Sequence, residues 1–98
     1  MLKALDADVR LIGIIGGDDF NSNISKLLIE TNIANKLIFD HQRKCTVKER
    51  YVGLAQHKHR QQIMRVDHED TYPLAKHIED NLIKAIEEAI NEAQIVLI

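Results

Sequence analysis

Three basic side chains recur at alternate positions in two polar segments near the middle of the chain. Lys48 and Arg50 stand two residues apart, and Arg65 stands in a second segment of the same kind. Side chains of a β-strand point alternately to opposite faces, so residues two apart share a face. Pairing of the two segments as strands would gather the three cations on one side. Arginine's planar fork suits phosphate oxygens and lysine adds a point charge, so the spacing predicts anion binding.

The segment that must position these cations is residues 45–70, CTVKERYVGLAQHKHRQQIMRVDHED. Period-two alternation on both sides of a glycine-interrupted middle predicts a β-hairpin. We expect its apolar face to carry four residues, namely Val47, Tyr51, Met64 and Val66. The opposite, polar face then carries Thr46, Lys48, Arg50, Arg65 and Asp67. In this alternation Gln62 falls on the side of Met64, and Ile63 falls on the side of Arg65.

An ion-paired strand face is the simplest alternative to a binding site. Glu49, Asp67 or Glu69 could neutralise the cations at little net gain in stability. The cations nevertheless exceed what the acids of the same face can pair, which favours binding. Gln61 and Gln62 are expected to add hydrogen bonds to hydroxyl groups of the ligand.

The hairpin also carries a family resemblance. The pattern T-x-K-x-R followed by Q-Q-x-x-R-x-D-x-E, from Thr46 to Glu69, resembles the lid hairpin of bacterial heptose 7-phosphate kinases. These are ribokinase-like (PfkB) carbohydrate kinases that make ADP-heptose for lipopolysaccharide. The flanking segments are similar to the family's strand–turn–helix before the lid and to its helix and strand after it. The resemblance covers essentially the whole chain.

The resemblance implies an α/β fold, a partial ribokinase-like domain over residues 1–98. Its core would be 1–40 and 71–98, and its lid hairpin 45–70. Two departures from the family stand out: the hairpin connection Tyr51–Arg60 is long, and Ala75 stands where a helix-capping serine is usual. The implied substrate-binding residues are Lys48, Arg50, Gln61, Gln62 and Arg65.

The implied reaction is transfer of the ATP γ-phosphate to heptose 7-phosphate, with ATP and magnesium in the parent enzyme. The family's catalytic aspartate sits in a G-A-G-D segment that these 98 residues do not contain. We therefore expect an internal piece with no catalytic residue and with neither cofactor bound to this chain alone. Two alternatives remain open: a ribokinase-like kinase of another sugar, and a stand-alone, non-catalytic binding module that uses the basic hairpin.

The core elements follow from hydrophobic patterning. Residues 9–15 and 95–98 are apolar runs typical of strands covered on both faces of a parallel sheet, and residues 36–40 predict a further short strand. A helix should follow the first run and end near Asn32, and a second should open at Pro73. Such strands would leave an apolar edge unpaired, so we expect a homodimer or larger assembly with contacts through the hairpin.

Other candidate sites have simpler explanations. Gly16 and Gly17 predict a tight turn with Asp18 as helix N-cap, because acids at the helix mouth would repel a phosphate. His57 and His59 lack a third ligand nearby, so we expect no metal. Cys45 has no neighbouring histidine to activate it and is expected to be a small buried residue.

Composition restricts the function further. The chain is 45% hydrophobic and 29% charged, which predicts a soluble globular domain, and its net charge of −2 argues against nucleic-acid or anionic-membrane binding. No apolar run approaches the roughly 20 residues that span a bilayer. A single cysteine fits a reducing compartment, so the cytoplasm is the expected location.

Overall fold

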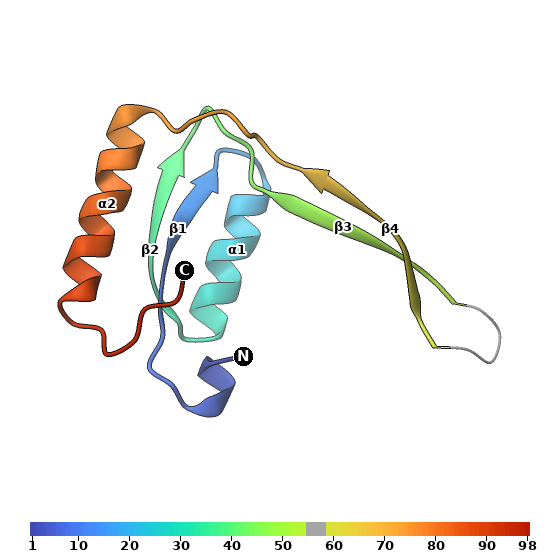
Figure 1. Cartoon of the computed structure of the whole chain (residues 1–98), viewed down its shortest axis with the longest axis horizontal. Helices are drawn as coiled ribbons and strands as arrows, with labels where there is room; N and C mark the ends of the chain where they lie inside the picture. The colour runs from blue at the N-terminus through green and yellow to red at the C-terminus, as the bar shows by residue number, and fades with distance from the viewer. Residues whose placement is uncertain (55–58) are drawn as a thin grey trace.

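The computed structural model describes residues 1–54 and 59–98. A short 3₁₀ turn, η1 (Lys3–Leu5), precedes six longer elements: β1 (Arg10–Gly16), α1 (Phe20–Glu30), β2 (Ala34–Asp40), β3 (Val47–Gly53), β4 (Gln61–His68) and α2 (Lys76–Ile90). Figure 1 shows that β3 and β4 project as a ribbon from a body made of the other elements. The ribbon gives the chain extents of 51 × 35 × 22 Å and a radius of gyration of 16.7 Å, against about 13 Å for a compact domain of about 100 residues.

The body is a two-stranded parallel sheet with a helix on each face, which confirms the α/β prediction. β1 pairs with β2 from Arg10 opposite Ala34 to Gly16 opposite Asp40, and α1 is the crossover between them. α2 covers one face, where Ile38, Ile78 and Ala85 form the core with partly buried neighbours from β1. Alternation along β1 turns Ile15, only 2% exposed, to the other face, where α1 contacts β1.

The helix boundaries differ from those that the sequence indicated. α1 ends at Glu30, two residues early, because Asn32 adopts a left-handed backbone with φ of 53°. Asp18 is not its N-cap; Asp19 holds that position and makes no side-chain capping bond. α2 begins at Lys76 and not at Pro73. Ala75 is the N-cap, and its carbonyl accepts the first backbone bonds without any side-chain cap.

The expectation of a strand over residues 95–98 is wrong. These residues form no strand, and Ile95 and Leu97 are 79% and 74% exposed. A strand needs a hydrogen-bonded neighbour, and within the described residues β1 and β2 pair only with each other. Each of these two strands therefore leaves one edge open in the described part of the chain.

The ribbon is an antiparallel hairpin, as predicted. Tyr51 lies opposite Met64, and a β-bulge follows, because the next pair is Val52 opposite Gln62. Ile63 is the extra residue of the bulge, and its side chain occupies the space where a Cβ of Gly53 would stand. Gly53 alternates with Tyr51, so Ile63 lies on the apolar face and not on the side of Arg65. This corrects the expected alternation, which assumed a regular strand.

Candidate functional site

The structure brings Lys48, Arg50 and Arg65 onto one face of the ribbon. Lys48 lies opposite Asp67, and Arg50 lies opposite Arg65, so strict alternation places all four side chains on the same side. We call this surface the basic face. Like charges directly opposite one another destabilise a strand pair. The pairing of two arginines is therefore a cost that hairpin stability alone does not explain.

Asp67 is the acid of this face that pairs with its cations. Its two carboxylate oxygens lie 3.6 Å from Lys48 Nζ and 3.1 Å from Arg65 Nε. Arg50 has no ion-pair partner among the described residues. Three cations against one carboxylate leave a local excess of positive charge at half-exposed side chains. An external anion can use that excess.

Glu49 does not neutralise the basic face because it belongs to the opposite face. There it accepts a 3.0 Å hydrogen bond from the Tyr51 hydroxyl and lies 3.6 Å from His68 Nε2. The hydrogen bond to Glu49 raises the pKa of Tyr51. Tyr51, Met64 and Ile63 of this apolar face remain 48%, 51% and 72% exposed.

The bulge places Gln61 and Gln62 on opposite faces of the ribbon, although both were expected to bond hydroxyl groups of the ligand. Gln62 pairs with Val52, which alternates with Arg50, so Gln62 joins the basic face. Gln61 pairs with Gly53 and falls on the apolar face. The expected side of Gln62, with Met64, is therefore wrong, because the extra residue shifts the alternation by one.

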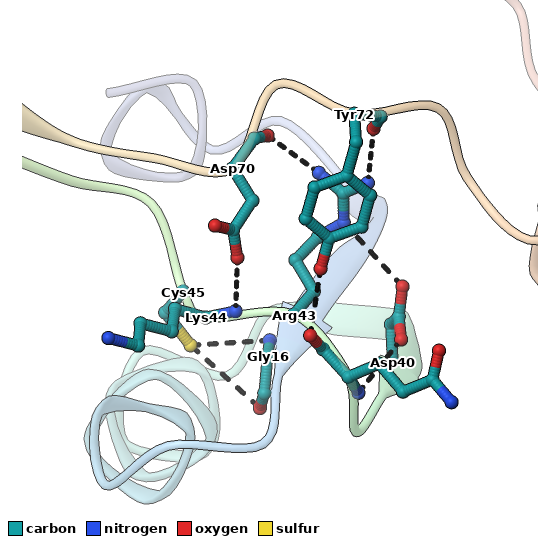
Figure 2. Close-up of polar contacts among 8 residues, drawn as sticks. Gly16, Asp40, Arg43, Lys44, Cys45, Asp70 and Tyr72 are labelled. Atoms are coloured by element: carbon teal, nitrogen blue, oxygen red, sulfur yellow. Dashed lines mark hydrogen bonds and ion pairs between the residues drawn. The ribbon is translucent and has the colours of Figure 1, made fainter.

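The base of the ribbon is organised by Arg43, which lies in the polar segment between β2 and β3. Its guanidinium donates hydrogen bonds to the carbonyls of Asp70 at 2.7 Å and Tyr72 at 2.6 Å. It lies 4.4 Å from the centroid of the Tyr72 ring, and Nε stands 3.5 Å from Asp40 Oδ2, an ion-pair distance without hydrogen-bond geometry. Figure 2 shows these partners around the guanidinium.

The ribbon's first strand is fixed to the end of β1 by Cys45. The Gly16 amide donates to Cys45 Sγ at 3.3 Å, and the Cys45 amide donates to Asp18 Oδ2 at 3.2 Å. Burial raises the pKa of the Cys45 thiol, with Asp18 adding to the effect, and hydrogen bonds from Cys45 lower the pKa of Asp18. Cys45 is buried, as predicted, and its thiol is held protonated and not activated.

Gly16 ends β1 and Gly17 opens the tight strand-to-helix turn that the sequence predicted. The space beside Gly16 is filled by the backbone of residues 43–45, and the Gly17 amide donates to the Arg43 carbonyl at 2.9 Å. A phosphate could not occupy this position without displacing that backbone. Gly13, in contrast, has no neighbouring atom within 4 Å of an added Cβ.

No group of three or more metal-ligating side chains occurs in residues 1–54 and 59–98, and His59 is exposed. His57 lies outside the described residues. Neither described α-helix has the length and apolarity needed to cross a membrane. Two shallow hollows, of about 220 and 390 Å³, lie between the sheet and α2, and neither is lined by a residue of the basic face.

The fold and the ribbon define a segment of an α/β protein that carries a projecting basic hairpin. No family model and no solved structure matches the chain. Among curated proteins, the chain is 30% identical over 97 residues to the bifunctional protein HldE of Campylobacter jejuni subsp. doylei, which covers 99% of the chain and 18% of that protein. It is 28% identical over 98 residues to HldE of Acidiphilium cryptum, covering 99% of the chain and 19% of the relative.

A third relative carries a more specific name. The D-beta-D-heptose 7-phosphate kinase of Bordetella bronchiseptica is 34% identical over 68 residues, covering 69% of the chain and 20% of that protein. The chain thus corresponds to a region of the heptose 7-phosphate kinases, which confirms the family resemblance. It spans about a fifth of the length of the curated relatives it matches.

Proposed function

We propose that this chain is part of a cytoplasmic sugar kinase that transfers the γ-phosphate of ATP to heptose 7-phosphate, in ADP-heptose and lipopolysaccharide synthesis. The chain supplies the lid over the sugar and part of the core. The observation that carries the proposal is the basic face, where one carboxylate pairs with two of three cations in a chain related to heptose 7-phosphate kinases. The 7-phosphate is the anion that this excess charge would bind.

Each residue of the basic face has its own role in the proposed binding. Arg50 is available for a bidentate contact, because no acid among the described residues engages it. Arg65 commits Nε to Asp67 and keeps its terminal nitrogens for a phosphate oxygen. Lys48 adds a point charge, and Gln62 lies where it can meet a hydroxyl group. Each direct charge-assisted contact is worth roughly 1.5–3 kcal/mol. Gln61, on the other face, is not part of this arrangement.

The glycine turn after β1 does not fit a nucleotide phosphate or a magnesium ion. The glycine turn that could have cradled a phosphate is filled by residues 43–45, and Asp18 is engaged by the Cys45 amide. ATP and magnesium therefore belong to the complete enzyme in this proposal, and we assign no residue of this chain to either. The chain's part is to bind and enclose the sugar phosphate.

A titration of the isotopically labelled chain with heptose 7-phosphate tests the proposal. We expect amide shifts in β3 and β4 near Lys48, Arg50 and Arg65, and a loss of affinity of at least tenfold in Arg50→Ala or Arg65→Ala. Lys84→Ala, which removes a cation from α2, is the matched control and should leave affinity unchanged. Heptose without the phosphate should bind far more weakly. Equal affinity in wild type and both arginine variants would refute the proposed site.

A further inference from the structure

The ribbon depends on its base for its orientation. Figure 1 shows it projecting from the body, with only the segments that lead into β3 and out of β4 joining the two. Within the part of the chain that the structure describes, neither β3 nor β4 packs on the sheet or on a helix as a third layer. Whatever holds these two segments together, and holds them to the sheet, therefore sets the direction in which the basic face points.

Arg43 makes two of the contacts that join the two segments. From the incoming segment, its guanidinium bonds to two carbonyls of the outgoing segment, at Asp70 and Tyr72. Two further bonds close the same junction: the Tyr72 hydroxyl donates to the Gln42 carbonyl at 2.7 Å, and the Lys44 amide donates to Asp70 Oδ2 at 2.9 Å. Figure 2 shows Asp70 and Tyr72 on either side of the Arg43 guanidinium.

The same side chain also ties the junction to the sheet. Asp40, the last residue of β2, faces Arg43 with 8% of its side chain exposed, and Arg43 itself has 14% exposed. Asp40 Oδ1 also accepts the Gln42 amide at 3.1 Å, which orients the carboxylate. A nearly buried guanidinium with this many directed partners is expensive to leave unsatisfied. Its planar, multi-donor geometry is one that lysine cannot reproduce.

We propose that Arg43 is a positioning residue that locks the ribbon to the sheet at one angle, with Tyr72 as the cover that keeps its guanidinium in place. Arg43 takes no part in binding the ligand. Its effect on sugar-phosphate affinity rests on the proposed function, because a ribbon free to swing would present the basic face in many directions. The lock itself is independent of any ligand.

Distance measurements between spin labels test the lock on the full chain. Labels at Leu54→Cys, near the end of β3, and at Glu79→Cys, on α2, report the angle of the ribbon. Both sites are exposed, whereas Cys45 is buried and should stay unlabelled. Wild type should give one narrow distance distribution, and Arg43→Ala should broaden it at least twofold. Lys44→Ala is the matched control, because it removes an adjacent charge but keeps the backbone bond to Asp70.

The outcomes separate the lock from general stability. An unchanged narrow distribution in Arg43→Ala overturns the proposal, and so does equal broadening in Lys44→Ala. If Arg43→Ala does not fold, Tyr72→Ala decides: it keeps the guanidinium but removes its cover and the bond to Gln42, so broadening supports the lock and an unchanged distribution overturns it. Arg43→Lys should broaden the distribution although it keeps the charge.

The ligand titration distinguishes the two proposals. With the lock and the proposed function both correct, Arg43→Ala binds heptose 7-phosphate more weakly while inorganic phosphate, which needs only the local basic face, binds as in wild type. Broadened distances without any binding of the sugar phosphate by wild type would refute the proposed function and leave the lock standing. Narrow distances in Arg43→Ala with normal binding would refute the lock alone.

Discussion

The amide of Gly16 donates a hydrogen bond to the buried sulfur of Cys45, so the end of β1 and the start of the ribbon are in direct contact. The contact is possible because Gly16 has no side chain. A Cβ there would overlap the backbone of Arg43, Lys44 and Cys45. Backbone atoms cannot rotate away as a flexible side chain can, so the glycine is a requirement of the junction.

Gly16→Ala should therefore destabilise the chain by about 1–3 kcal/mol or more, the cost typical of overpacking. Urea denaturation followed by circular dichroism measures this as a lower midpoint. Gly13→Ala is the matched control in the same strand, because a Cβ there meets no atom within 4 Å. Gly13→Ala should be neutral or slightly stabilising. Equal midpoints for the two variants would contradict the packing at Gly16.

The thiol of Cys45 should react slowly in the native chain, and its ionisation at high pH should lower the free energy of unfolding. Burial raises its folded pKa above the ordinary value of 9.0. The folded state therefore holds the proton more tightly, and stability that is complete below pH 9 should be lost as the pH rises above it. Cys45→Ala should lack this part of the alkaline loss of unfolding free energy. Thiol alkylation at pH 8 should be slow in the native chain and fast in urea, and rapid native alkylation would contradict the burial.

Asp67 should lower the affinity of the basic face for simple anions. Its carboxylate pairs with Lys48 and Arg65, so Asp67→Asn frees both cations. Inorganic phosphate should bind several-fold more tightly to Asp67→Asn, a gain of up to about 1 kcal/mol, the strength typical of an exposed ion pair. Calorimetric titration measures the change, and it should shrink at high salt. Glu49→Gln, an acid of the other face, should leave phosphate affinity unchanged, and weaker binding to Asp67→Asn would show that Asp67 itself helps to hold the anion.

The hairpin and the parallel strands were predictable because each depends on a local pattern. Alternation placed Lys48 and Arg50 on one face, and an apolar run located β1. The bulge at Ile63 was not predictable from period-two alternation, because one extra residue leaves both flanking patterns intact. It nevertheless decides that Gln62 and not Gln61 joins the cations.

The contacts of Arg43 at the base of the ribbon were not predictable for a different reason. The two hydrogen bonds of Arg43 across the junction go to backbone carbonyls 27 and 29 residues away, and every residue carries a carbonyl. No pattern of side-chain types in the sequence can predict such a contact. The apolar run 95–98 gave the opposite error, because it predicted a strand that does not form. An apolar pattern indicates only that a segment is able to pair as a strand. Whether it does depends on a neighbouring strand.

The chain should self-associate through the apolar face of the ribbon. Tyr51, Met64 and Ile63 remain largely exposed there, and no described element covers them. Exposed apolar side chains on a projecting two-stranded ribbon are stabilised by burial against another surface, and a second copy offers an identical one.

We expect a homodimer at micromolar concentration in sedimentation velocity, and Met64→Glu should shift it to the 11.2 kDa monomer. Ile29→Glu, on the exposed side of α1, is the control and should leave the dimer intact. A wild-type monomer, or a dimer that survives Met64→Glu, would exclude the apolar face as the interface.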